Sequence, residues 1–588
     1  MVKVAIIGNG VWGSKIENCI KDGVQFVEPS KAEWIIIATP NDLHYEQAEN
    51  WLGKRKNVFC EKPLTLTTKT SEMLFSLADF MSVKLYVDDV FTWYDNLDID
   101  VSRTVDFKWY KHGSFNANII DNLAYHHFYL WLDNKEFEVD EIQKKYYTPY
   151  TMNILITLKD GRRASFDYNI LSKVNKRTIN GVEVNSVNNP LRDMLLAVFD
   201  KKVDFDSNRK RTLNAIKLCE SVKKEICEDV LVVGGGIFGT TAAIMLATSG
   251  YNVTLHEELS SIMKCASNIN QYRLHRGYHY PRSRETAKEC LDGIKSFKRK
   301  YEDSIVNEDA NHYYTISSHD SLVTPKQYLE FLDSMGLKYE QVDSFQGTDL
   351  TVKVSEDLFD SENLRIQAIE KMKSVGVDVI LDRQTIKEDY DDYDIVVIAT
   401  YAKINELLYE QKSFRPDRQY QFEVVEKPVV KLPESYKNKS VVVMDGPFMC
   451  LDPYKEGLHV LGHVKHAIHD TNIGMYPVVS NEDIAEYLNN GVIENPKITN
   501  IQKFIDAGME FFEDFDKLEH IGSMFTIRTV LAYRDYDDAR PTYVKKEHDT
   551  EIQTDKIYTI FSGKIGTCVN AANELLLKIK EDINYVKT

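Results

Sequence analysis

The stretch "DVLVVGGGIFGTTAAIMLATSGYNVTLHEE" at residues 229–258 decides the fold of the second half of the chain. It reads as a buried strand, a turn containing Gly234, Gly236 and Gly239, a helix of small residues and a second strand. Glycines in such a turn let the backbone approach a pyrophosphate, whose charge the helix N-terminus stabilises. Glu257, 18 residues after Gly239, is placed to bind a ribose. The stretch therefore predicts a complete dinucleotide-binding unit.

The beginning of the chain shows the same strand–turn–helix pattern. "KVAIIGNGVWGSK" at residues 3–15 is a strand, a glycine turn and the start of a helix. On its own such a turn can also serve only tight packing. Two later stretches favour nucleotide binding: "WIIIATPNDLHYEQA" at residues 34–48 and "NVFCEKPLTLT" at residues 57–67. Each is a buried strand followed by a polar turn.

The GxGxxG, TPNxxH and EKP motifs, in this order, resemble the glucose–fructose oxidoreductase and inositol dehydrogenase (Gfo/Idh/MocA) family, and the resemblance extends to about residue 226. It implies NAD or NADP as cofactor and Lys62 as a catalytic residue beside the nicotinamide, where an amine polarises the substrate oxygen. It also implies His126 as a second catalytic group and Asp121 as a substrate-binding residue. The cofactor-binding residues that it implies are Gly8, Gly10, Gly13, Glu28, Thr39, Pro40, Asn41 and Glu61.

Two departures from this family stand out. The strand ending at Glu28 is followed almost at once by the next strand, so one crossover is expected to be missing. The family places a histidine four residues after the aspartate, whereas His126 stands five after Asp121. One residue turns a side chain by about 100° on an α-helix. Either a local shift restores His126 to the site, or the acid–base group is lost and the histidine belongs to an aromatic core.

"SNINQYRLHRGYHYPRSRETAKEC" at residues 267–290 follows the second glycine turn and resembles the D-amino-acid-oxidase-like (DAO) flavoprotein family, particularly members similar to 2-hydroxyglutarate oxidase. "DDARPTYV" at 537–544 and "TIFSGKIGTCVNAANELL" at 559–576 continue the resemblance, which covers residues 228–588. It implies FAD as cofactor, held by residues of the glycine turn, the following loop and the last strand-to-helix turn: Gly234, Gly236, Gly239, Glu257, Asn270, Gly563, Lys564 and Ile565.

A flavin that oxidises a C–H bond beside nitrogen or oxygen needs a group that takes the heteroatom proton and a clamp that aims the carbon. His275 and His279 are the candidates for the catalytic proton role. The substrate-binding candidates are Arg273, Tyr278, Tyr280 and Arg540. The alternative is that several of these side chains only hold the loop and the FAD.

We therefore expect an α/β and α+β chain of three parts. Residues 1–90 form a shortened NAD(P)-type Rossmann domain and residues 91–226 an open-sheet domain. Residues 227–588 form the FAD module, with an FAD-binding part at about 227–300, 370–405 and 535–588. An inserted antiparallel-sheet substrate domain occupies about 301–369 and 406–534.

Composition narrows the function classes. The formal charge of −18 argues against nucleic-acid binding. No apolar run is long enough to span a membrane, and the 8 scattered cysteines favour a reducing cytoplasm. His459, His463, His466 and His469 show no regular metal-ligand spacing, so no metal is expected. A homo-oligomer is compatible with the open sheet, which in the first family often packs against a partner subunit.

Three functions are compatible with the sequence. The first is a bifunctional oxidoreductase for small polar substrates, with both sites active, in a sugar or nucleotide-sugar pathway. The second is a single FAD enzyme whose N-terminal half is a scaffold or substrate-binding module. The third is a non-enzymatic nucleotide sensor, which the complete FAD signature disfavours.

Overall fold

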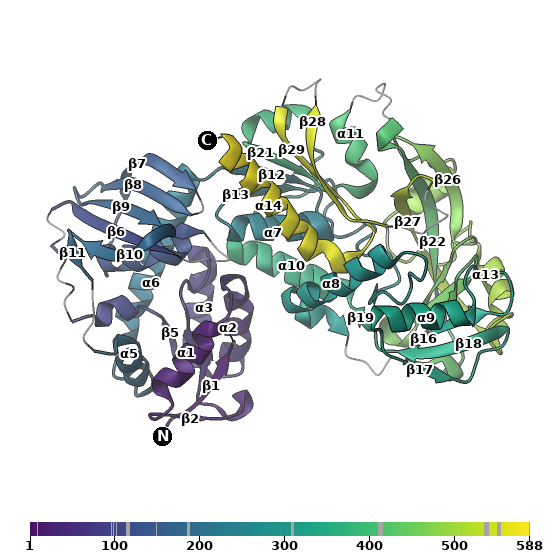
Figure 1. Ribbon diagram of the computed structural model, residues 1–588, viewed down its shortest axis with the longest axis horizontal. Coiled ribbons are helices and arrows are strands. Elements are labelled where there is room, and N and C mark those ends of the chain that lie inside the picture. Colours follow the sequence, from purple (N-terminus) through teal and green to yellow (C-terminus); the bar gives the residue numbers. More distant parts are fainter. Residues whose placement is uncertain are drawn as a thin grey trace. The chain divides into compact units, whose positions relative to one another are not determined.

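The computed structural model (Figure 1) describes residues 1–8, 10–95, 97, 99–100, 103–112, 118–148, 150–184, 188–306, 311–409, 416–533, 540–549 and 554–586. The chain divides into two compact units. The first comprises Met1–Val230, Ile244–Val253 and Ile369–Asp378, and the second comprises Leu231–Ala243, Thr254–Ala368 and Val379–Thr588.

The N-terminal sheet of the first unit has the strand order β2-β1-β3-β4-β5 and is parallel throughout. Its strands are β1 (Lys3–Ile7), β2 (Gln25–Phe26), β3 (Trp34–Ile37), β4 (Asn57–Cys60) and β5 (Leu85–Val87). The helices α1 (Val11–Ile20), α2 (His44–Gly53) and α3 (Thr68–Met81) accompany them. Only a short 3-10 turn (Pro29–Lys31) separates β2 from β3, so the expected loss of one crossover is confirmed.

A second sheet of the first unit has the order β11-β10-β6-β9-β8-β7. It comprises β6 (Val105–His112), β7 (Val139–Thr148), β8 (Thr151–Leu158), β9 (Arg163–Asn169), β10 (Leu171–Ile179) and β11 (Val182–Glu183), with helices α4 (Tyr125–Leu132), α5 (Pro190–Phe199) and α6 (Phe205–Ile226). Side chains of both sheets join one hydrophobic core, which includes Trp34, Phe107 and Phe166.

The FAD-type sheet has the order β20-β13-β12-β21-β29-β28. Its strands are β12 (Asp229–Val233), β13 (Asn252–His256), β20 (Asp378–Ile380), β21 (Ile395–Ile398), β28 (Tyr543–Asp549) and β29 (Thr554–Phe561). The glycine turn leads from β12 into α7 (Ile237–Thr248), and β29 leads into α14 (Cys568–Val586), which packs beside α8 (Arg284–Lys300) (Figure 1). The other helices of this part are α10 (Ser361–Val375) and α11 (Ile404–Leu408).

The largest sheet of the second unit has the order β17-β18-β16-β23-β24-β25-β22-β26, and β27 pairs with β22. Its strands are β16 (Asn311–Ser317), β17 (Tyr339–Val342), β18 (Thr348–Val354), β22 (Tyr420–Lys431), β23 (Lys439–Met444), β24 (Met449–Pro453), β25 (His459–His463), β26 (Ile468–Gly474) and β27 (Glu519–Leu531). Helices α9 (Pro325–Met335), α12 (Glu482–Tyr487) and α13 (Ile501–Gly508) accompany it, and β14 (Arg273–Leu274), β15 (Ile305–Val306) and β19 (Asp357–Phe359) form a small separate sheet. The predicted mixed α/β and α+β fold class is confirmed.

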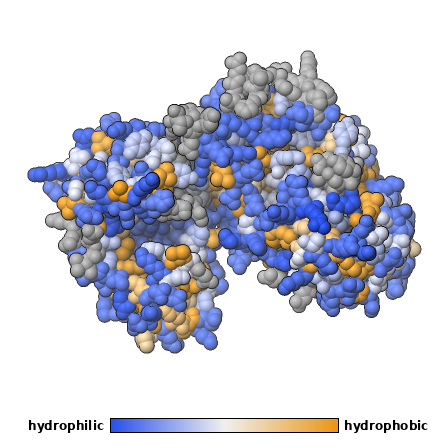
Figure 2. Space-filling view, viewed as in Figure 1, coloured by the Kyte–Doolittle hydropathy of each residue, from blue (hydrophilic) through white to orange (hydrophobic). Residues whose placement is uncertain are grey.

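Hydrophilic residues cover most of the visible face, and hydrophobic residues appear there in scattered patches (Figure 2). Among the described residues, no helix combines the length and the apolar character needed to cross a membrane.

Candidate active sites

The three glycines of the second turn play different structural parts. Gly234 has φ +103°, and a Cβ there would lie 2.8 Å from the carbonyl oxygen of Ala399. A Cβ on Gly239 would lie 1.9 Å from the carbonyl oxygen of Gly234. A Cβ on Gly236 would approach only the Ser267 hydroxyl, at 3.4 Å. The protein's own packing therefore requires the first and third glycines, while the middle one leaves room beside the start of α7.

That room belongs to a cavity of about 940 Å³ in the second unit. This volume is at the upper end for ligand sites, which span roughly 300–1,000 Å³. The predicted cofactor-binding residues that line it are Gly234, Gly236, Glu257, Gly563, Lys564 and Ile565. Lining residues that the sequence did not single out include Tyr401 and Thr526, from the turn after β21 and from β27. An extended dinucleotide fits this donor set.

Glu257 ends up close to the glycine turn. One carboxylate oxygen accepts a hydrogen bond from the Gly235 N–H (2.7 Å), and the other accepts from the Leu259 N–H (2.9 Å). Burial raises the pKa of this carboxyl group, and the two backbone bonds oppose the rise. The side chain thus braces the turn while lining the cavity where a ribose would lie.

A cluster of polar aromatic side chains lies beside Lys564. The ring centroids of His275 and His279 are 5.1 Å apart, and His279 lies 5.2 Å from Tyr280. The Lys564 ammonium sits 5.2 Å over the Tyr280 ring and donates to the carbonyl oxygen of Arg540. Lys564 lines the cavity and contacts Tyr280, whose ring in turn contacts both histidines.

Burial lowers the pKa of His275 well below its ordinary value, and the neighbouring charges of His279, Arg273, Lys564 and Arg540 lower it further. Its Nδ1 atom is buried and has no hydrogen-bond partner among the described residues. The imidazole is therefore neutral, and its unused ring nitrogen is available to a hydrogen-bond donor.

Two of the predicted substrate-binding residues already bond to other parts of the protein. Arg273 is buried, donates to Asp452 and lies 3.6 Å from Glu356, so its charge is already neutralised within the protein. Tyr278 donates to the carbonyl oxygen of Lys338 (2.7 Å), and its ring packs in the same hydrophobic core as that of Tyr280.

Asn270 shapes the loop that it belongs to. Its amide donates to the carbonyl oxygens of Ala266 and Ser267, and its side-chain oxygen accepts from the Tyr272 N–H at 2.7 Å. The sequence could not show these pairings. The ion pairs of Arg273 in particular depend on partners 83 and 179 residues further along the chain.

The first glycine turn repeats the geometry of the second. Gly8 has φ +117° and faces the carbonyl oxygen of Ala38, and a Cβ on Gly13 would lie 2.0 Å from the Gly8 carbonyl oxygen. A Cβ on Gly10 would meet nothing within 4 Å. The middle glycine again leaves open space at the start of a helix, here α1.

The TPN and EKP turns are joined by His44, whose ring nitrogens lie 2.8 Å from the Pro63 carbonyl oxygen and 2.9 Å from that of Thr39. Thr39 donates through its hydroxyl to Gln47 (2.7 Å). The Asn41 side-chain nitrogen is buried without a hydrogen-bond partner among the described residues, as expected of a donor that serves a ligand. Pro40 caps the short turn that follows β3.

Glu28 is exposed where β2 ends, so the ribose-reading part of this site is small. In the extended Rossmann arrangement a further strand and helix would flank this acid. Its cofactor role stays a prediction.

Lys62 donates a hydrogen bond from Nζ to the Asn122 carbonyl oxygen (2.6 Å). Burial lowers its pKa, although the carboxylates of Glu61, Asp88 and Asp121 oppose this. Burial raises the pKa of Asp88 to about 6. Lys62 is therefore an amine with a lowered pKa, and lowering is the direction that favours proton transfer by a lysine.

A π-helical turn (Ile120–Ala124) precedes α4 and resolves the spacing of Asp121 and His126. The Tyr125 N–H bonds to the Ile120 carbonyl oxygen five residues back. Such a turn absorbs one extra residue within a helix. His126 consequently lies near Lys62. Burial is the main cause of the lowered pKa of His126, and the charge of Lys62 is the second.

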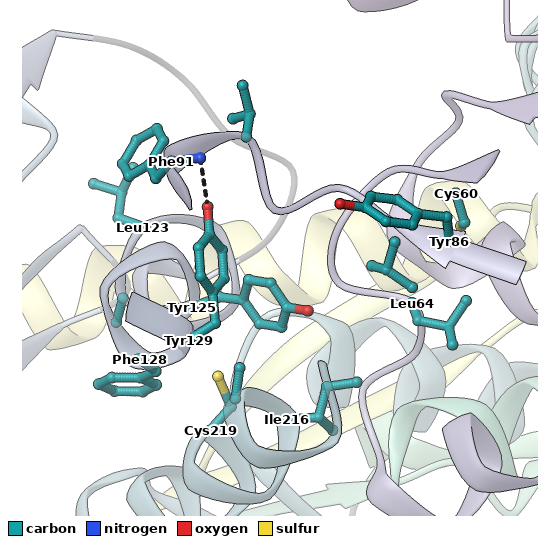
Figure 3. Close-up of a cluster of buried hydrophobic side chains, with 14 of the residues drawn as sticks. Cys60, Leu64, Tyr86, Phe91, Leu123, Tyr125, Phe128, Tyr129, Ile216 and Cys219 are labelled. Carbon is teal, nitrogen blue, oxygen red and sulfur yellow. Dashed lines mark hydrogen bonds between the residues drawn. The ribbon is translucent and has the colours of Figure 1, made fainter. Parts of the chain in front are cut away.

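The π-turn is anchored on both sides. Asp121 pairs with Lys223 of α6 (3.3 Å), so its charge is already engaged. His126 stacks on Phe91 with ring centroids 4.4 Å apart, and its Nδ1 lies 3.2 Å from the Tyr129 hydroxyl. Figure 3 shows that hydroxyl accepting a hydrogen bond from the Phe91 N–H (3.0 Å), within buried side chains from the π-turn, α4 and α6.

The four histidines near β25 and β26 do not gather at one point, although the ring centroids of His463 and His466 lie 4.2 Å apart. His469 pairs with Glu426, and His463 Nδ1 accepts from the backbone N–H groups of Lys465 and His466. In the part of the chain that the structure describes, no group of three or more His, Cys, Asp or Glu side chains is arranged to hold a metal ion.

Comparison with protein families matches these two sites to two families. Residues 14–89 match the GFO_IDH_MocA family, described as "Oxidoreductase family, NAD-binding Rossmann fold". Residues 229–339 match the DAO family, described as "FAD dependent oxidoreductase". Two separate segments of the chain thus match the models of two oxidoreductase families, the same two families that the sequence resembles.

The curated relatives match over short segments. FAD-dependent monooxygenase FPY4 of Fusarium mangiferae is 30% identical over 110 residues, which is 19% of this chain and 30% of that protein. Glucose-6-phosphate 3-dehydrogenase of Bacillus subtilis is 38% identical over 53 residues, 9% of this chain and 15% of that protein. The matches thus span less than a third of either relative.

Solved structures resemble each part at low sequence identity. Glycine oxidase from Geobacillus kaustophilus gives a TM-score of 0.44 at 13% identity, covering 60% of this chain and 95% of that one. UDP-N-acetylglucosamine 3-dehydrogenase GnnA from Acidithiobacillus ferrooxidans gives 0.35 at 12% identity, covering 38% and 97%.

Proposed function

We propose that the protein is a bifunctional oxidoreductase with an FAD site and an NAD(P) site, each acting on a small polar molecule. The observation that carries this proposal is a phosphate-binding space, here called the cradle, beside the middle glycine of each glycine turn. In both glycine turns the first and third glycines pack against backbone atoms, and a Cβ on the middle glycine, Gly10 or Gly236, would enter free space. A scaffold would have no need to keep that space clear in both modules.

At the FAD site, bound FAD would supply the acceptor for a hydride from a C–H bond next to an OH or an amine. His275, neutral because it is buried, would take the heteroatom proton, with His279 beside it. Arg540 and Tyr280 are the proposed substrate contacts, since Lys564, which lines the cavity, contacts both of them.

At the N-terminal site, bound NAD(P) would exchange a hydride with a carbinol carbon. Lys62 would hold the substrate oxygen, and its lowered pKa suits it to give or take the hydroxyl proton. His126, buried and neutral, would be the second acid–base group. Sugars and nucleotide sugars are the proposed substrates, in keeping with the family resemblance and with the sugar phosphate named in one relative's title.

The alternative is an FAD enzyme whose N-terminal module does not catalyse. The two-residue strand β2 and the exposed Glu28 favour it, because both reduce the part of the site that would read the ribose. The cradle at Gly10 and the position of His126 favour the bifunctional reading.

The test begins with the absorbance spectrum of the purified protein, which reports bound flavin. Titration with NADH and NADPH then follows nicotinamide fluorescence and flavin bleaching. Flavin together with nicotinamide binding that Gly10→Val abolishes supports two working sites. Flavin without nicotinamide binding leaves the single FAD enzyme, and absence of flavin contradicts both readings.

A further inference from the structure

The open-sheet side of the N-terminal site carries a group of aromatic and cationic side chains that the motifs did not mark. Trp109 and Lys111 lie two residues apart on β6 and so share one face of the sheet. Arg177 on β10 pairs directly with Trp109 across the two strands. Cross-strand partners point to the same side, so all three side chains stand together.

This face is the one that meets His126. The Trp109 ring lies 5.8 Å from His126, and the Arg177 guanidinium lies 4.3 Å from the Phe91 ring on which His126 stacks. Tyr94 adds a second aromatic ring, 5.1 Å from the same guanidinium. Two strands and the segment after β5 therefore present an aromatic and basic wall to the proposed acid–base pair.

The charges on this wall are close to one another. Burial lowers the pKa of Lys111, and the charges of Lys62, Arg177 and Lys15 lower it further. Arg177 donates to the Val184 carbonyl oxygen (3.1 Å). Among the described residues, its Nε atom has no hydrogen-bond partner and no carboxylate lies within ion-pair distance of its guanidinium. A guanidinium that has no carboxylate beside it is suited to bind an anion.

The opposite face of β6 shows what ordinary pairing looks like in this sheet. Lys108 lies 2.8 Å from Asp106, and Tyr110 donates to Asp167. In a chain of net charge −18, carboxylates are abundant. Their absence from Arg177 therefore distinguishes the face toward His126 and fits a ligand that brings its own negative charge.

We infer that the N-terminal site takes an anionic polyol, a sugar that bears a phosphate or a carboxylate. Arg177 and Lys111 bind the anionic group, and Trp109 packs against the apolar face of the sugar. This inference rests on the proposed dehydrogenase function, because it places the substrate hydroxyl at Lys62 and His126. Lys15 stands on α1 close to the glycine turn and is left to the cofactor phosphates.

The test is calorimetric titration of the full-length protein, with and without saturating NAD⁺, at low and high salt. The probes are inorganic phosphate, D-glucose 6-phosphate, D-glucuronate and D-glucose. The two anionic sugars should bind at least tenfold more tightly than D-glucose, because hydrogen bonds between charged groups are stronger than those between neutral groups. A preference for one of them identifies phosphate or carboxylate as the anion.

The variants are Arg177→Met and Lys111→Met, with Lys108→Met as the matched control on the opposite face of the same strand. Arg177→Met should weaken the preferred anion about tenfold or more, and Arg177→Lys should recover part of that loss. Lys108→Met should bind as the wild type does. Circular dichroism shows whether each variant is folded.

Equal affinity for D-glucose and the anions, no binding of any anion, or unchanged affinity in both variants would overturn the inference. NADH titration separates this outcome from failure of the proposed function. Anion binding without NADH binding would leave the wall as a ligand site while removing the dehydrogenase. NADH binding without anion preference would keep the proposed dehydrogenase and remove the anionic substrate.

Discussion

Asp121 and His126 are held in register by one π-helical turn, in which the Tyr125 N–H reaches back to the Ile120 carbonyl oxygen. The turn takes up the extra residue between them, and α4 then continues as an ordinary helix. His126 thereby comes within the electrostatic reach of Lys62. The next residue, His127, faces the core and pairs with the Tyr168 hydroxyl at 2.8 Å.

These neighbouring histidines make a matched pair for mutation. We expect His126→Asn to lower NAD(P)H formation about 10²–10⁴-fold, the usual contribution of a positioned acid–base group. His127→Asn should instead lower the melting temperature and leave the turnover of the folded enzyme close to that of the wild type, because its ring is fully buried in packing contacts. Turnover is measured with the anionic sugar that binds best. Equal loss of turnover in both folded variants would contradict the assignment of His126.

The glycine turns yield a second contrast. Gly236→Val should fold, because no protein atom blocks a side chain at this position. It should lose FAD, because the new side chain would occupy the space of the pyrophosphate. Gly234→Val should lose stability even before cofactor is added, since its φ is +103° and its Cβ would collide with the Ala399 carbonyl oxygen. Flavin absorbance and melting temperature of the two variants check this. A yellow, FAD-loaded Gly236→Val protein would show that the cradle lies elsewhere.

These turns could be predicted from the sequence because their glycines answer local requirements, a positive φ or a close backbone contact. The surroundings of Arg273 could not be predicted, because its partners are distant in the sequence. Glu356 immediately precedes β19 and Asp452 lies on β24, and only the tertiary fold brings them to Arg273. The pairing of Arg177 with Trp109 likewise depends on strand register between distant segments. The offset of His126 was visible in the sequence, but only the backbone hydrogen bonds of the π-turn decide between its two explanations.

Lys564 lines the FAD-type cavity and connects to Tyr280, so its charge should act on a bound flavin. We expect Lys564→Met to weaken sulfite binding to the flavin about tenfold or more, because a nearby positive charge stabilises the negative charge that sulfite brings. Lys578→Met, in an exposed pair with Glu574 on α14, is the control. Spectral titration with sulfite measures both. Unaltered sulfite affinity in a flavin-loaded Lys564→Met protein would place this ammonium too far from the flavin to act.

Glu426 is a buried carboxylate that holds four donors in the large sheet. His469 Nε2 lies 2.7 Å from it, and the Thr499 hydroxyl, the Asn500 N–H and the Ser523 hydroxyl donate to its two oxygens. Burial alone would raise the pKa of Glu426, but the hydrogen bonds from His469, Ser523 and Thr499 outweigh it and lower the pKa below the ordinary value. The group therefore favours folding whenever it is ionised.

The sign of the pH dependence follows. A carboxyl whose pKa is lower in the folded than in the unfolded state adds stability above the unfolded value, about 4.3. That stability is lost as the pH falls through the folded pKa. We expect Glu426→Gln to cost about 2–4 kcal/mol at pH 7, because hydrogen bonds to a charged acceptor are weakened and one donor loses its partner. The difference from the wild type should shrink toward pH 4, since the same carboxyl group in the unfolded state, with a pKa of about 4.3, then begins to be protonated. Scanning calorimetry at both pH values, with exposed Glu434→Gln as the control, measures this, and an equal shift in melting temperature at pH 7 and pH 4 would show that the carboxylate charge contributes nothing to the effect.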